Sequence, residues 1–154
     1  MKIVNIILLF VVNLMMVMPA QAQLSRKTTE PEFKVTYEGY EIDTREGLYI
    51  PKEGFFQIDL ANQQELYASL PDDAYISFIS SEARLISPQD GTVVSMTQDH
   101  EFLDNDLDLI PIMRQAAAHD KLELEVKYVY VARKGNGKTK VLKEGSKVLS
   151  VPLK

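Results

Sequence analysis

The stretch from Leu122 to Lys154 limits the possible folds most, because apolar residues recur there at every second position. The alternating residues are Leu122, Leu124, Val126, Tyr128, Tyr130 and Ala132. Charged side chains fill most of the positions between them, with Val129 and Val131 as apolar exceptions. A period of two places successive side chains on opposite faces of an extended chain. The pattern therefore predicts a long strand with one buried face.

A tight return follows this strand. Gly135 to Lys138 contains two glycines and an asparagine, which tolerate the positive φ angles of a hairpin turn. Thr139 to Leu142 then starts back along the strand, Glu144 to Ser146 interrupts it, and Val148 to Leu153 forms a terminal strand. We expect a hairpin followed by a separate last strand, with Gly137 at the tip.

Shorter strands precede this hairpin. Alternation or β-branched residues predict strands from residue 33 to about 39 and over residues 48–50, 56–60, 75–80, 83–86 and 92–97. We expect Tyr40 and Ile42 to continue the first of these after a bend. Residues 61–70 stay ambiguous, because Leu66 and Leu70 have helical spacing but Pro71 follows at once. Short strands separated by Gly- and Pro-containing turns predict an all-β, sandwich-like (Ig-like) domain of antiparallel strands.

One segment has a helical pattern. Its apolar residues fall at i, i+3, i+4 and i+7 and form a single stripe: Leu109, Ile112, Met113 and Ala116. Acidic residues precede the stripe, where the helix dipole favours them. We expect one short helix from about Asp108 to Ala118, lying across the sheet.

The N-terminal residues have the composition of an export signal. Lys2 precedes an apolar run from Ile3 to Met18, and Ala20-Gln21-Ala22 is a small-x-small cleavage site. These features predict a signal peptide over residues 1–22, with the mature chain starting at Gln23. The alternative is an uncleaved N-terminal anchor. Because no cysteine follows the apolar run, lipid attachment at a new N-terminal cysteine is excluded.

The mature chain has the size and charge of one acidic domain. Cleavage after Ala22 leaves 132 of the 154 residues and removes one lysine and no acid, so the net charge changes from −5 to −6. An acidic chain without a basic block is a poor candidate for binding nucleic acid or anionic lipid. We expect a flexible leader over residues 23–32 and a single domain over 33–154. An exported chain without cysteine must rely on packing, which suits the bacterial periplasm.

Residues that could carry chemistry are few. We expect both His100 and His119 to be solvated, because neither has a second histidine or a cysteine at ligand spacing. Asp104 to Asp108 has a D-x-D-x-D pattern that can bind Ca²⁺, but Leu109 and Gln115 replace the Gly and Glu that an EF-hand loop needs. The acidic run is therefore interpreted as a helix start. The sequence predicts no catalytic residue, no metal site and no cofactor.

Tyrosines offer an alternative function. The chain has seven tyrosines, whose flat amphipathic rings could form a platform for a glycan or another ligand. In a β-rich domain, tyrosines more often fill the periphery of the core. A secreted glycan- or ligand-binding module is thus the second hypothesis.

The order of segments from residue 75 to 154 resembles a known family. A strand (YISFISS), an acid-preceded helix (DLDLIPIMRQAAAHD), an alternating strand (KLELEVKYVYV) and a hairpin tip (GNGKTKVL) follow one another. This order resembles the C-terminal domain of the gliding-motility protein GldM, a periplasmic component of type IX secretion. The matching positions are Asp120, Gly137, Lys138 and Pro152. The resemblance implies a stand-alone relative of that domain, working in an envelope assembly.

Together these features predict a non-enzymatic, periplasmic protein–protein interaction module, with no nucleic acid partner and no membrane span in the mature chain. We expect the contact to lie on the terminal strand, where a partner strand could add beside Val148, Leu149, Ser150 and Val151. Pro152 cannot donate a backbone hydrogen bond, which is one way in which exposed edges are limited.

Overall fold

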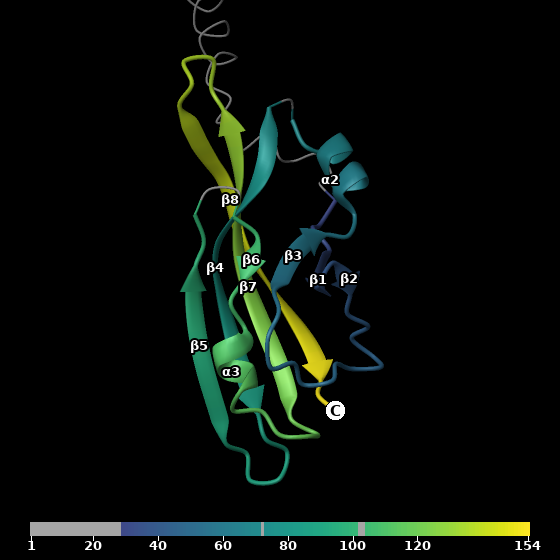
Figure 1. The fold of residues 1–154 in the computed structure, drawn as a ribbon. Coiled ribbons are helices and arrows are strands. Elements are labelled where there is room, and N and C mark those ends of the chain that lie inside the picture. Colours follow the sequence, from purple (N-terminus) through teal and green to yellow (C-terminus); the bar gives the residue numbers. More distant parts are fainter. Residues whose placement is uncertain (1–28, 72, 102–103) are drawn as a thin grey trace, which may run out of the picture.

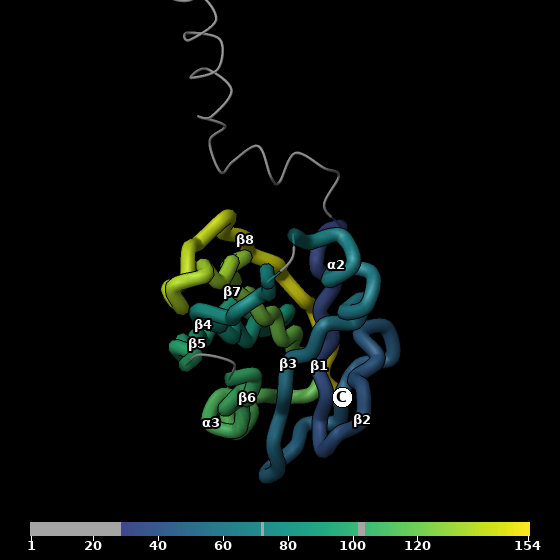
Figure 2. The backbone as a smooth tube through the Cα atoms, turned by 90° about the horizontal axis from the view of Figure 1, so that it is seen from above, coloured from purple at the N-terminus to yellow at the C-terminus, as the bar shows by residue number. Residues whose placement is uncertain are grey.

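The protein is a sandwich of two antiparallel four-stranded sheets in the computed structural model, which describes residues 29–71, 73–101 and 104–154 (Figure 1). Viewed from above, the sheets form two layers, with β6 and α3 at one side of the interface between them (Figure 2). The all-β sandwich prediction is confirmed. The predicted signal peptide, residues 1–22, lies outside the described residues.

The first sheet has the order β2-β1-β3-β6. Its strands are β1 (Phe33–Tyr37), β2 (Tyr40–Glu41), β3 (Phe56–Leu60) and β6 (Asp106–Leu107). Tyr40 and Ile42 do not continue β1 as expected, because the chain reverses at Glu38 and Gly39. Both residues have positive φ, 50° and 81°, which turns β2 back along β1.

The second sheet has the order β5-β4-β7-β8. Its strands are β4 (Ala74–Ile86), β5 (Val93–Asp99), β7 (Lys121–Arg133) and β8 (Thr139–Pro152). β7 is the long strand predicted from alternation, and Gly137 has positive φ at the hairpin tip, as expected. The predicted interruption at Glu144 to Ser146 is wrong, because β8 runs through it. Gly145 lies opposite Tyr128, and its lack of a side chain leaves room for that ring.

β4 is also longer than predicted. The two strands expected at residues 75–80 and 83–86 form one strand with a bulge at Ile79, where the register shifts between Phe78 and Ser80. The bulge changes which residues face inward, from even-numbered Ile76 to odd-numbered Ser81 and its successors. Ser81 and Glu82, which separate the two predicted strands, are therefore part of one continuous strand.

The helix predicted over Asp108 to Ala118 is present but much shorter, and a second short helix occupies the segment that the sequence left ambiguous. The helices of the described residues are α2 (Gln63–Ser69) and α3 (Ile110–Met113). Neither is long and apolar enough to cross a membrane. α3 ends early because the chain turns: the Asp120 carboxylate accepts a 2.8 Å hydrogen bond from the Ala117 amide, and His119 adopts a positive φ of 77°. The apolar stripe packs inside the sandwich without a long helix.

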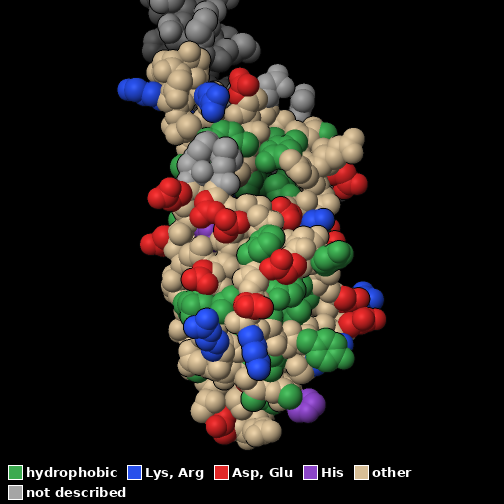
Figure 3. Space-filling view, in the orientation of Figure 1, with side chains coloured by type: hydrophobic (Ala, Val, Ile, Leu, Met, Phe, Trp, Pro, Cys, Tyr) green, Lys and Arg blue, Asp and Glu red, His purple; other side chains and the backbone are tan. Residues whose placement is uncertain are grey.

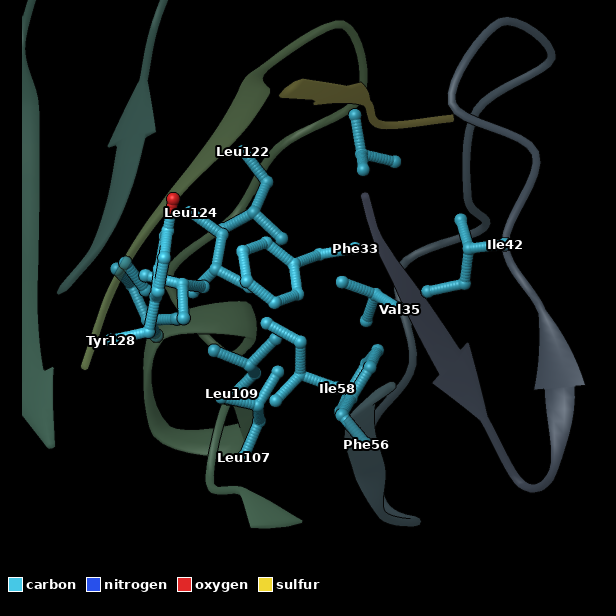
Figure 4. Packing of buried hydrophobic residues seen from close by; sticks show 14 of the residues in the cluster. Phe33, Val35, Ile42, Phe56, Ile58, Leu107, Leu109, Leu122, Leu124 and Tyr128 are labelled. Atoms are coloured by element: carbon cyan, nitrogen blue, oxygen red, sulfur yellow. The ribbon is translucent and has the colours of Figure 1, made fainter. Parts of the chain in front are cut away.

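The core lies between the two inner sheet faces (Figure 4). It combines residues of the first sheet with alternating residues of β7, and with residues just before α3. Among them are Phe33, Val35, Phe56, Ile58, Leu107, Leu109, Leu122, Leu124 and Tyr128. Fully burying one such side chain stabilises the fold by about 1.5–3 kcal/mol, so this cluster holds the two layers together.

The end of the predicted flexible leader is packed. Pro31 is fully buried, and the Glu32 amide donates a 2.9 Å hydrogen bond to the Asn62 side-chain oxygen. The Thr29 amide donates to the Ser69 hydroxyl at 3.1 Å, beside α2. The expectation of a free leader is therefore corrected for residues 29–32, because these contacts fix them to the domain.

Candidate functional site

The predicted contact residues lie on β8, which occupies the outer edge of the second sheet. Their exposure alternates along the strand. Val148 is 50% exposed and Ser150 is exposed, whereas Leu149 is half-buried and Val151 is only 3% exposed. Val148 and Ser150 thus face outward from the sandwich, and Leu149 and Val151 face the core.

The backbone of β8 also alternates between its neighbour and its free side. The Leu153 amide donates to the Asp120 carbonyl at 2.8 Å, so Leu153 bonds toward β7. The Pro152 carbonyl instead accepts a 2.9 Å bond from the Leu48 amide on the opposite side. Because backbone groups of successive residues in an antiparallel strand point to opposite sides, Val148 and Ser150 direct theirs away from β7.

A short segment covers one end of this edge. Leu48 pairs with Leu153 in a parallel bridge, and the Lys154 amide donates to the Leu48 carbonyl at 2.9 Å. A Cβ on Gly47 would lie 2.5 Å from the Pro152 carbonyl oxygen, so glycine permits this close approach. Within the described residues, no strand covers β8 from Ser146 to Ser150 on this side. The open part of the edge therefore includes three of the predicted residues and excludes Val151.

Sequence reasoning missed this closure. Residues 48–50 were predicted to form a short strand, but no local pattern indicated that their partner is the end of the chain. The available signal was Pro152 itself: its missing N–H faces the segment at Leu48, which needs only the carbonyl.

A second candidate site is a hollow of about 220 Å³ between β3, α2 and β4. Its lining includes two aromatic rings, Tyr67 and Phe78, with Gln63 at its side. Asn105 donates a 3.2 Å hydrogen bond to the Asp59 carboxylate at the same hollow. Hydrophobic side chains gather around a recess in the upper part of this face, above a band of acidic ones (Figure 3). A mixed aromatic and polar lining is suited to a small polar ligand.

His100 is buried, which corrects the expectation that it is solvated. Its side chain has no exposed surface, and its Nε2 atom lies 2.9 Å from the Ser81 hydroxyl. The ring packs against Phe78, with 6.2 Å between ring centroids. Burial lowers the pKa of His100, while the charges of Asp104 and Asp99 oppose that shift. His119, in contrast, is exposed.

Ser81, His100 and Asp104 lie side by side in the spatial order of a Ser–His–Asp hydrolytic triad, but their geometry differs from one. His100 Nδ1 is 3.9 Å from the nearer Asp104 oxygen, which is beyond hydrogen-bond range. Ser81 is only 3% exposed and faces the core of the sandwich. A nucleophile must reach a substrate carbonyl, so this trio acts as an internal polar contact.

The acidic run from Asp104 to Asp108 forms an irregular segment and β6 instead of the predicted helix start. Asp104 accepts a 3.0 Å hydrogen bond from the Asp106 amide, and Asp106 accepts one of 2.9 Å from the Gln57 side chain. Across the described ranges, no three His, Cys, Asp or Glu side chains are grouped to hold a metal. The carboxylates of Asp104 and Asp106 thus serve as hydrogen-bond acceptors within the fold.

Comparison with known proteins adds no family to this geometry. No family model, curated protein or solved structure matches the chain. The features of the protein that bear on its function are the β8 edge, the hollow beside α2 and the sequence itself.

Proposed function

We propose that this protein is a non-enzymatic, exported periplasmic module that binds another protein by strand addition at β8. The observation that carries the proposal is the open edge around Val148, whose outward backbone groups have no partner strand within the described residues. An extended segment can satisfy such groups with main-chain hydrogen bonds. Alternate side chains would then supply specificity.

Export and location depend on the N-terminal sequence. The apolar run and the Ala20-Gln21-Ala22 site support cleavage after Ala22 and release into the periplasm. The resemblance to the C-terminal domain of GldM supports a role within an envelope assembly of the gliding or type IX secretion kind. Intact mass of the protein from a periplasmic extract tests this part, since loss of residues 1–22 is expected. A membrane-bound, full-length species would contradict it.

The edge is tested by removing one outward amide. Val148→Pro deletes an N–H that faces away from β7, so the sheet should stay folded while strand addition is blocked. Thr97→Pro is the matched control, because Thr97 occupies the equivalent outward position on β5, the other edge of the same sheet. The His100 amide donates to the Ile79 carbonyl and therefore points toward β4. Thr97 precedes His100 by three residues, an odd number, so its amide points to the opposite side, away from β4.

The measurement is quantitative capture of proteins from the native envelope, with melting temperature recorded for each variant. We expect Val148→Pro to lose its partners and Thr97→Pro to keep them. Leu149→Pro removes an amide that bonds to β7, so it should unfold the protein. If Val148→Pro stays folded and captures partners at the wild-type level, the edge is not the contact surface.

A glycan- or ligand-binding module is the second candidate, favoured by the hollow beside α2. Its two aromatic rings, Tyr67 and Phe78, can stack on a sugar while Gln63 and Asp59 bond its hydroxyl groups. The test is binding to a panel of bacterial oligosaccharides by calorimetry. Tyr67→Ala should abolish the heat, whereas Tyr49→Ala, an equally large change at a 76% exposed tyrosine outside the hollow, should not. Equal binding by both variants would exclude the hollow.

A further inference from the structure

The hairpin of β7 and β8 carries a charge opposite to that of the rest of the protein. Residues 133–147 contain six basic residues and one acid, Glu144, although the whole chain has a net charge of −5. All six basic residues are exposed: Arg133, Lys134, Lys138, Lys140, Lys143 and Lys147. Two or more residues separate most of them, so they did not register as a basic block in the sequence. The hairpin tip projects at one end of the molecule, away from the C-terminus (Figure 1).

Three of these lysines share one face of the sheet. Lys140, Lys143 and Lys147 pair with Ala132, Tyr130 and Val126 of β7, respectively. These partners are separated by even numbers of residues, so they point to the same side, and so do the lysines opposite them. At about 3.4 Å per residue, the steps between the three pairs are about 7 Å and about 14 Å.

The charge of these lysines is not neutralised within the described residues. None of the three has a carboxylate within ion-pair distance there. Lys143 lies 5.9 Å from the Tyr130 ring centroid, which holds its ammonium group near the sheet. Glu144 pairs with Val129 and thus belongs to the other face.

We propose that the segment that adds to β8 is acidic, with carboxylates facing this lysine row. The proposal depends on the strand addition proposed above and specifies its partner. On a strand beside β8, two acids four residues apart would face Lys143 and Lys147, with the position between them opposite Gly145. Opposite charges across neighbouring strands stabilise the pairing.

Two other occupants conflict with the charge pattern. A second copy that pairs β8 with β8 would bring lysines against lysines, which is unfavourable and is a recognised way to protect edge strands. The chain's own residues 1–28 contain Lys2, Arg26 and Lys27 and no acid. The partner is therefore a separate acidic segment.

The test uses the mature protein and a nine-residue, labelled peptide of Thr and Val with Glu at two positions four residues apart. A control peptide carries Lys at the same two positions. We expect saturable binding of the acidic peptide only, measured by fluorescence anisotropy at about 0.15 M salt, where charges more than about 8 Å apart are largely screened. Lys143→Glu with Lys147→Glu should weaken binding about tenfold or more, because two attractions become repulsions. Lys134→Glu with Lys138→Glu, the same charge change at the hairpin tip, should leave affinity within about twofold.

The outcomes distinguish the proposal of an acidic partner from the underlying proposal of strand addition at β8. If both double variants weaken peptide binding equally, the peptide is held only by the overall positive charge of the hairpin. That result would overturn the proposal that the lysine row faces the carboxylates of the partner. The acidic peptide could fail to bind while Val148→Pro still loses its envelope partners. That result would overturn the proposal of an acidic partner but would still support strand addition at β8. If Val148→Pro retains those partners, the edge function itself fails.

Discussion

Gly145 is the position where a single methyl group should cost most relative to its size. A Cβ built there would lie 2.5 Å from Cζ and 2.6 Å from the hydroxyl oxygen of Tyr128. The Tyr128 ring has little freedom to move aside, because its centroid is 5.1 Å from that of Phe33 and 5.8 Å from that of Tyr130. Overpacking of this kind costs about 1–3 kcal/mol, so Gly145→Ala should lower the free energy of unfolding by that amount.

Urea unfolding followed by circular dichroism measures the effect, and Gly135→Ala provides the control. Nothing lies within 4 Å of a Cβ on Gly135, so that change should stay within about 0.5 kcal/mol. Tyr128→Leu removes the ring tip, and the double variant with Gly145→Ala should lose less stability than the two single changes together. Equal stability of the Gly145 and Gly135 variants would refute the close approach of Tyr128 to the backbone of β8.

Three further predictions concern the tip, the buried histidine and the acidic run. Gly137→Val should lower the free energy of unfolding by about 1–2 kcal/mol in the same urea assay, because φ is +77° at Gly137. Gly135→Val should be close to neutral. Equal losses of stability would show that the turn is not centred on Gly137. Since burial holds the pKa of His100 below its ordinary 6.5, the unfolded chain takes up the proton first, and stability should fall as pH drops below about 6.5. Unfolding midpoints between pH 7.5 and 5 should show that His100→Gln removes part of this loss and His119→Gln does not; identical curves would place His100 in solvent. Melting with Ca²⁺ or with chelator should give the same midpoint, because the carboxylates of Asp104 and Asp106 already accept hydrogen bonds within the protein, and a saturable rise with Ca²⁺ would reveal a site.

The sequence indicated strands best where a single period persists. β7 was predicted within one residue of its start, because alternation from Leu122 to Tyr130 matches a face that is buried throughout. β4 was divided in two because its inward face changes parity at the bulge, and the change from Ile76 to Ala83 is visible only if a bulge is considered. Periodicity assumes a regular strand, so it fails where one extra residue is inserted.

The helix was overestimated for a related reason. Leu109, Ile112 and Met113 are buried, as the stripe predicted, but a buried turn meets the same requirement as a helix face. The Asp120 side chain then accepts a hydrogen bond from the Ala117 amide and ends the segment. The spacing of apolar residues cannot predict such an interaction. At the candidate site, the terminal strand from Val148 was predicted, whereas the continuity of β8 through Gly145, its cover at Leu48 and its lysine row depend on pairing register, which local patterns do not specify.

The bridge between Leu48 and Leu153 has a consequence for the order of folding. It joins two residues separated by more than two-thirds of the chain, and it uses the carbonyl of Pro152 and the amide of Lys154. Loop-closure entropy makes so distant a contact a late event. The segment at Leu48, which connects β2 to β3, therefore cannot pair with the end of the second sheet until the residues up to Lys154 have emerged. A nascent chain remains open at this seam until its last residues are available.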